Sequence, residues 1–482
     1  MDKKDYALCW GIAFAIAALF LLSTGLVEDW GYWYSKSVPY RLQTEAMLSG
    51  RIALAPSPSG VEHDMIWANG GVQQPWGLGV PVWRLPFEVM AKLFGQPAFP
   101  DRLAFGVALA CVLYAVFRVL VLGSEQESLQ KQNSGLRRFL TGILALLLLV
   151  FFPPFLTLCR FRFNVYEEAV AYAYLVGTLL FVATLHFIRK PKISTCAILS
   201  LSAGLVPFVR PTLLFYGIAT MLTIWIHTCR IGWNRQKSWL GLVLFACGGG
   251  LLFLANYERF DSGFEFGHHL NLNRIDPFRF AMRFDHPFQT EPLISAAKEL
   301  FSCLFFSTDQ FNGYDWYRAA FFPGQSTTLR WREIYFTTFG LGCLVMLLVT
   351  WGAFLSHQWR SRSSVRHPKC FSSIEVMAFW SLVAAALLTV FYLRCPCIAS
   401  RYMVDFAPAF AVGILAFANM TLNALGRRFS NRPALLMVCF AIIAGWWGFQ
   451  VLTAKSRFPS DKAIDQARAI NCANDQIVRP KG

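Results

Sequence analysis

Charge is what this sequence has least of. Asp, Glu, Lys and Arg together make up 15% of the 482 residues, whereas hydrophobic residues make up 55% and the mean hydropathy is +0.43. A soluble protein of this size could not cover so much apolar surface, because its exterior must meet water. The composition therefore excludes an ordinary soluble enzyme and predicts a protein whose solvent is largely lipid.

Acidic residues are the scarcer kind of charge, with 28 Asp and Glu against 44 Lys and Arg, for a net charge of +16. Such an excess is also found in proteins that bind nucleic acid. Here the basic residues stand in short clusters between long apolar segments, which is the pattern of cytoplasmic loops in membrane proteins. We therefore expect membrane lipids as partners and no nucleic acid.

Several motifs of cytosolic chemistry are missing. The sequence has no P-loop, no G-x-S-x-G and no dinucleotide fingerprint, so a transferred group would not come from a cytosolic nucleotide. The 13 cysteines include no paired C-x-x-C, and most lie inside apolar segments, where cysteine acts as a small hydrophobic residue. This excludes a disulfide framework and a typical structural zinc site.

Long apolar segments are what the sequence has instead. About eleven crossings place every basic cluster on one side of the membrane, together with the N-terminus, which we predict to be cytoplasmic. We expect the first segment to be an uncleaved anchor, because no small-x-small cleavage site precedes Glu28. The predicted spans are 7–27, 103–122, 139–158, 170–187, 193–209, 212–229, 239–255, 334–354, 374–393, 403–425 and 435–453.

The predicted fold class is an all-α polytopic membrane protein with a large first outer loop. The corresponding regions are the first transmembrane helix (1–27), the first outer loop with amphipathic helices (28–101), transmembrane helices two to seven (102–255), a second large outer loop (256–333), transmembrane helices eight to eleven (334–454) and a C-terminal tail (455–482).

Short patterns converge on the predicted outer face. In the first outer loop, residues 40–51 read as an amphipathic helix ended by Gly50. A Gly- and Pro-rich stretch, 69–81, then leads into an apolar segment. Arg160 to Glu168 joins spans three and four, and Arg401-Tyr402 opens span ten.

Together these patterns resemble the GT-C superfamily of polytopic glycosyltransferases, which includes protein O-mannosyltransferases and the aminoarabinose transferases of lipid A. The resemblance covers most of residues 1–425 as an order of spans and motifs. It implies transfer of a hexosyl or pentosyl group from a polyprenyl-phosphate donor to a glycan, lipid or protein acceptor. The reaction would take place on the periplasmic or luminal face of a cell membrane, in bacteria the inner membrane.

The resemblance also suggests roles for individual residues. A carboxylate is needed as general base for the acceptor hydroxyl, and Asp29 leads the candidates Asp29, Glu28, Glu168 and Glu167. The departing lipid phosphate needs positive charge, for which the candidates are Arg401, Tyr402, Arg160 and Arg210. The candidates for contact with the substrate are Tyr40, Gln74 and Trp76. A divalent cation such as Mg²⁺ or Mn²⁺ could share the phosphate charge, with His63 and Asp64 as candidate ligands.

One departure and several alternatives stay open. Lys36 and Ser37 stand where many relatives carry an acidic pair. Acids and arginines at span ends also serve as helix N-terminal residues or as headgroup anchors, and aromatic residues form interface belts. The rival functions are a transporter or flippase, a lipid-linked glycan polymerase or ligase, and a non-enzymatic interaction protein.

Overall fold

The computed structural model of this chain describes residues 3–26, 33–35, 38–60, 64–122, 142, 145–150, 152, 155–156, 158–159, 163–233, 235–267, 270, 292–305, 339–362, 372–395 and 400–428. Two of the predicted segments, 435–453 and the tail 455–482, lie outside the described residues, as do nine of the 20 residues of 139–158.

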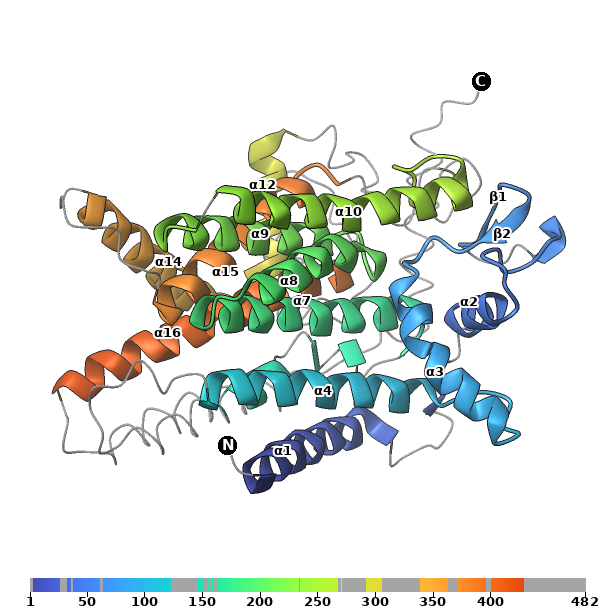
Figure 1. The fold of residues 1–482 in the computed structure, drawn as a ribbon, viewed down its shortest axis with the longest axis horizontal. Helices are drawn as coiled ribbons and strands as arrows, with labels where there is room; N and C mark the ends of the chain where they lie inside the picture. The colour runs from blue at the N-terminus through green and yellow to red at the C-terminus, as the bar shows by residue number, and fades with distance from the viewer. Residues whose placement is uncertain are drawn as a thin grey trace, which may run out of the picture.

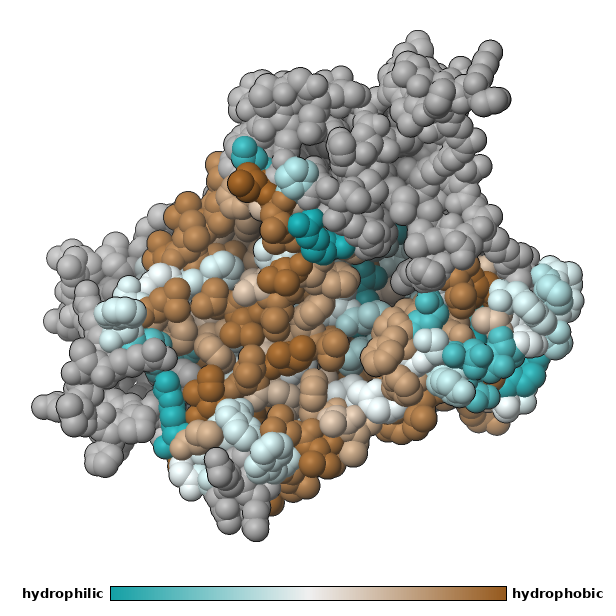
Figure 2. Space-filling model, turned by 90° about the horizontal axis from the view of Figure 1, so that it is seen from above, coloured by the Kyte–Doolittle hydropathy of each residue, from teal (hydrophilic) through white to brown (hydrophobic). Residues whose placement is uncertain are grey.

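The protein is a polytopic helical membrane protein. Seven of its described helices are long and apolar enough to cross a bilayer. They are α1 (Lys3–Leu21), α4 (Asp101–Leu122), α7 (Val165–Arg189), α10 (Arg235–Phe260), α14 (Gly340–Arg362), α15 (Ser373–Tyr392) and α16 (Ala407–Arg428). Only 17% of the apolar window of α10 and 22% of that of α14 are buried, and a broad apolar surface is visible in Figure 2. These faces would be stable only against lipid.

Helix α7 is the centre of the bundle (Figure 1). It packs against α4, α15, α16 and the shorter helix α9 (Leu213–Arg230), and 78% of its apolar window is buried. Helix α1 lies on the outer side of α4, where the rings of Trp10 and Tyr114 stack with centroids 4.0 Å apart.

Helix α8 (Ile193–Leu205), which a 3₁₀ turn extends to Phe208, lies directly against α10. Glycines allow the backbones of α8 and α10 to come this close together. A Cβ atom on Gly204 would lie 2.2 Å from the carbonyl oxygen of Phe245, and one on Gly248 would lie 2.7 Å from the carbonyl carbon of Gly204. Small residues at such a seam let two helix backbones meet, as is common within membranes.

Two arginines at helix C-termini mark one side of the bundle. Arg189, at the end of α7, donates to Ser373 at the start of α15, over 3.2 Å, and to the carbonyl of Val119 in α4. Arg230, at the end of α9, donates to Gln358 of α14 over 3.2 Å. We call this side the basic end.

The opposite side, here called the loop end, comprises the N-terminal ends of α4, α7, α9 and α16 and the C-terminal end of α10. The first outer loop packs on it, at the right of Figure 1. Within this loop, α2 (Pro39–Leu48) is followed by Gly50 at φ +72°, which confirms the predicted helix and its glycine stop.

The rest of the first outer loop contains a hairpin and a second helix. Strands β1 (Ile66–Ala68) and β2 (Gly71–Gln73) pair antiparallel through Asn69 and Gly70, which both have positive φ, as a tight hairpin turn requires. Helix α3 (Gly79–Leu93) then returns the chain to α4. The backbone of Gly77 meets residues 208–209, where a Cβ atom would lie 2.1 Å from the carbonyl oxygen of Phe208.

Several helix boundaries differ from the hydropathy prediction, among them the end of α14, which lies at Arg362 rather than at 354. Helix α7 begins at Val165 rather than near residue 170, because Glu167 and Glu168 are polar yet stabilise a first helical turn. Helix α10 continues to Phe260 rather than ending at 255, so the expected second outer loop starts later. That loop also contains a helix, α12 (Leu293–Phe305).

Candidate functional site

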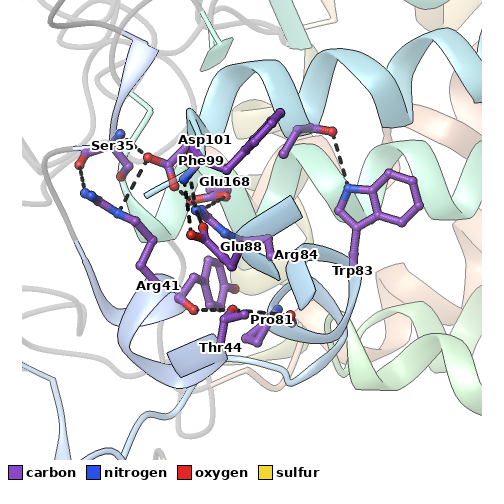
Figure 3. Close-up of polar contacts among 12 residues, drawn as sticks. Ser35, Arg41, Thr44, Pro81, Trp83, Arg84, Glu88, Phe99, Asp101 and Glu168 are labelled. Carbon is purple, nitrogen blue, oxygen red and sulfur yellow. Dashed lines mark hydrogen bonds and ion pairs between the residues drawn. The ribbon is translucent and has the colours of Figure 1, made fainter. Parts of the chain in front are cut away.

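A buried arginine ties the first outer loop to the bundle. Arg84 of α3 donates to Asp101, the first residue of α4, and to Glu88 one turn further along α3, over 2.5 Å. The carboxylate of Glu168, in the first turn of α7, lies 3.6 Å from the same guanidinium group. Figure 3 shows the three acids around Arg84, whose side chain is 1% exposed. The guanidinium group of Arg84 therefore links helix α3 to helices α4 and α7.

Further donors complete this cluster. Asp101 accepts from the backbone N–H of Ser35 over 2.7 Å and lies 3.7 Å from Arg41 of α2. Glu88 accepts from the backbone N–H of Phe99 over 3.1 Å. Burial alone would lower the pKa of Arg84, but the charges of Asp101 and Glu168 outweigh it and hold that pKa above its ordinary value. Arg84 therefore stays charged, and the cluster is a structural anchor.

A second buried ion pair lies where α9 and α16 begin. The Nε of Arg210 lies 2.9 and 3.1 Å from the two carboxylate oxygens of Asp405. Tyr392, at the end of α15, donates to the same carboxylate over 2.5 Å, and Tyr216 of α9 donates to the carbonyl of Asp405. Arg210 is thus already neutralised within the protein.

Arg401 has a different environment. Its guanidinium group lies 4.4 Å from the centroid of the Tyr166 ring and 5.3 Å from that of Tyr402, and it is half-buried. Arg210 lies over the Tyr402 ring as well, at 4.9 Å. Aromatic faces orient a guanidinium group, and the planar set of N–H donors of such a group suits an anion such as phosphate.

Residues of the first outer loop reach the same place. The hydroxyl of Tyr166 donates to the carboxylate of Asp64, and the Trp76 ring stands edge-on to Tyr166 at 5.4 Å. Trp76 in turn meets Tyr40 at 6.5 Å. Aromatic rings, a carboxylate and a guanidinium group are thus assembled from α2, the 64–76 segment, α7 and the start of the 3₁₀ helix Ser400–Phe406.

A small pocket lies beside this assembly. It is lined by Trp76 and Leu78 of the first outer loop, by Phe208, and by Leu252, Asn256 and Arg259 of α10. Arg259 donates to the backbone carbonyl of Gln74, which joins the end of α10 to the first outer loop.

The structure brings many of the predicted site residues to the loop end. Those it places there are Tyr40, Gln74, Trp76, Asp64, Glu167, Glu168, Arg210, Arg401 and Tyr402. Four others, Glu28, Asp29, His63 and Arg160, lie outside the described residues. Among the described residues, no group of three or more His, Cys, Asp or Glu side chains could hold a metal ion.

The sequence reasoning missed the partners that hold the site. Arg84 and Glu88 carry a local signal, since they stand four residues apart on a helix and can pair. Asp101 was treated only as a boundary between loop and span. Asp405, Tyr216 and Tyr392 carry no local signal, because their partners are distant in the sequence.

No known protein-family model and no curated protein sequence matches this chain.

Proposed function

We propose that this protein is an integral membrane glycosyltransferase of the GT-C type, which moves a sugar from a polyprenyl-phosphate donor to an acceptor at the loop end. The observation that carries the proposal is the position of Arg401. This half-buried guanidinium group rests on Tyr166 and Tyr402, beside a carboxylate and the tryptophan and tyrosine of the first outer loop.

Three of the arginines at the loop end differ in their partners. Arg84 and Arg210 are each occupied by carboxylates, so they hold the framework. Arg401 is held by aromatic rings and is the candidate for the donor phosphate, because a guanidinium group offers paired N–H donors to phosphate oxygens. Trp76 and Tyr40 offer ring surfaces to the sugar.

The base candidates also divide. Glu168 is 1% exposed and shares Arg84, so it is poorly placed to take a proton from an acceptor. Asp64 is half-buried and hydrogen-bonded to Tyr166, the residue beneath Arg401. We favour Asp64 among the described acids, and Asp29 and Glu28 keep their candidacy.

The reaction is a displacement at the anomeric carbon. The acceptor hydroxyl loses its proton to the carboxylate as its oxygen bonds to that carbon. The bond between the carbon and the phosphate oxygen breaks, and its electron pair leaves on the lipid phosphate, whose charge Arg401 stabilises.

The position of the buried ion pairs favours a transferase over a transporter. Asp101 and Glu168 stand in the first turns of α4 and α7, and Arg210 and Asp405 stand just before α9 and α16. Arg84 comes from α3, which is not one of the seven long apolar helices. Transporters place ion and substrate sites near the middle of the bilayer. With this function we propose about eleven crossings in all, a cytoplasmic N-terminus and a site on the outer face.

The test is donor consumption by the purified full-length protein in lipid nanodiscs. A panel of hexosyl and pentosyl polyprenyl phosphates should include one from which polyprenyl phosphate is released when an acceptor is present. Absence of both release and donor binding across the panel would refute the proposal.

A further inference from the structure

Helix α3 of the first outer loop turns its charged residues inward and its apolar residues outward. Arg84 and Glu88 are buried against Asp101, at 1% and 3% exposure. A helix on the surface of a soluble protein has the opposite arrangement, with its charged side chains toward water. The exposed face of α3, continued by one residue, is apolar and comprises Val82, Pro86, Val89, Met90, Leu93 and Phe94.

This apolar face is most exposed where α3 ends. Leu93 is 79% exposed and Phe94 is 78% exposed. Lys92 is the one charged residue of α3 that is exposed, and it stands in the last turn of the helix. The long side chain of a lysine can lie along an apolar surface while its ammonium group reaches water or lipid headgroups. A contiguous apolar face of this kind marks a surface that is covered by something other than water.

The contacts of α3 set its level along the bundle. The Nε1 of Trp83 donates to the carbonyl of Ala104, in the first turn of α4, over 3.3 Å. The rings of Phe87 and Phe99 lie 5.1 Å apart between centroids, just before α4 begins. Figure 1 shows α3 at this end of α4. Because α4 is long and apolar enough to cross a bilayer, α3 lies at the level where that helix enters the membrane.

Helix α3 is too short to cross the membrane itself. Its 15 residues span about 22 Å, whereas the hydrocarbon core is about 30 Å thick. A helix with one apolar face at the boundary between headgroups and acyl chains is stable when it lies in the plane of that boundary.

We propose that α3 is an interfacial helix, whose face from Val82 to Phe94 lies in the lipid leaflet at the loop end. Lipid already surrounds α4 at this level, so the membrane itself is the partner that the face fits. The inner face is joined to α4 and α7 through Arg84. The first outer loop is thus held between the bundle and the membrane surface, and this anchoring does not depend on sugar transfer.

Spin labelling tests where the face lies. Cysteines placed singly at Val89 and Leu93, in full-length protein without native cysteines, carry a nitroxide, and the protein is placed in lipid nanodiscs. The collision rate of each nitroxide is measured with oxygen, which concentrates in lipid, and with a nickel chelate, which stays in water. We expect oxygen collisions to exceed nickel collisions several-fold at both positions. Leu348, exposed in the middle of α14, is the lipid control, and Ser59, exposed in the first outer loop, is the water control.

Photolabelling provides a second measurement on the unmodified protein. The nanodiscs contain a phosphatidylcholine with a diazirine near the carbonyl end of one acyl chain. After illumination, mass spectrometry of a tryptic digest should find the lipid attached to peptide 85–92 or 93–102, which carry the apolar face of α3. Labelling of α14 serves as the positive control.

Three results would overturn the proposal. Nickel collisions at positions 89 and 93 as frequent as at Ser59 would place the face in water. Few collisions with either reagent would place protein on it, and dipolar coupling between nitroxides of two chains would identify that protein as a second copy. Labelling of α14 without either α3 peptide would exclude lipid from the face. If the cysteine-free protein does not fold, the photolabelling decides the question.

Discussion

At the scale of single residues, the loop end shows how one side-chain type takes different roles through its partners. Arg84 has three acids within reach, and Arg210 has one acid in a two-oxygen contact. Arg401 rests on two tyrosine rings. A substitution of Arg84 or Arg210 should therefore lower stability, whereas a substitution of Arg401 should lower the affinity for a ligand.

Arg401→Ala should weaken donor binding by about tenfold or more, because charge-assisted bonds to phosphate are strong. Arg401→Lys should recover part of the affinity, since an ammonium group keeps the charge but lacks the planar pair of donors. Binding of a polyprenyl-phosphate sugar to protein in nanodiscs measures both, with Arg51→Ala as the matched surface control. Unchanged affinity in Arg401→Ala would leave Arg401 as an interface anchor.

Asp64→Asn should lower sugar transfer by roughly two orders of magnitude or more while donor binding is largely kept, because the amide preserves shape but cannot accept a proton. Asp29→Asn and Glu28→Gln are assayed in parallel with it. Full turnover in Asp64→Asn together with its loss in Asp29→Asn would assign the base to the start of the first outer loop. Full turnover in all three variants would exclude a carboxylate base at these positions.

At the scale of elements, two devices set the positions of the helices. The first is the Arg84 cluster, through which α3, α4 and α7 share one cation. The second is the glycine seam, where α8 and α10 meet backbone to backbone at Gly204 and Gly248. The Arg84 cluster and the glycine seam both lie close to segments that line the site. Substitutions in either should lower stability, and should lower activity as a consequence.

Arg84→Met should lower stability by about 3–5 kcal/mol, because removing one partner of a buried ion pair leaves the other charges uncompensated. Glu168→Gln should cost less, since Asp101 and Glu88 remain to pair with Arg84. Thermal unfolding of the purified protein measures both, with Arg51→Met as the control for loss of a positive charge. A Tm for Arg84→Met equal to that of the control would show that the cluster contributes nothing.

Gly204→Ala should destabilise the protein by about 1–3 kcal/mol, because the added methyl group meets the backbone of α10 and forces the two helices apart. Gly249→Ala is the matched control on α10, where an added Cβ atom meets nothing within 4 Å. Equal Tm values for the two variants would contradict the close packing of this seam.

How far the sequence predicts this structure depends on whether the signal is local. The amphipathic pattern of α2 and its glycine stop are local, and both are confirmed. The pairing of Arg210 with Asp405 joins residues 195 positions apart, and nothing in the spacing of either residue indicates the other. The predicted helix boundaries were wrong where polar residues belong to a helix, as at the start of α7. Hydropathy does not recognise acidic residues that stabilise the first turn of a helix.

At the scale of the whole molecule, the bundle has two chemically different ends. The basic end gathers Arg189 and Arg230 with Gln358 of α14 and Glu375 of α15. The loop end collects the buried acids, the aromatic residues and the first outer loop. This polarity agrees with a bundle whose basic end faces the cytoplasm.

Cysteines placed at Ser59 and Lys190, both exposed, should react from opposite sides of the membrane in a variant without native cysteines. An impermeant maleimide added to intact cells should label position 59, and position 190 only after permeabilisation. Labelling of both positions in intact cells would contradict the proposed orientation.

The length of α10 has a consequence for the chemistry at its end. With 26 residues the helix is about 39 Å long, whereas the hydrocarbon core of a bilayer is about 30 Å thick. In a bilayer the excess length would place the polar residues at the ends of the helix, among them Asn256 and Arg259, near the level of the headgroups. A thicker membrane would draw these residues toward the hydrocarbon, and a thinner one would lift them into water, unless the helix changes its tilt. Hydrophobic mismatch is therefore a variable to which both the pocket and the docking of the first outer loop should respond.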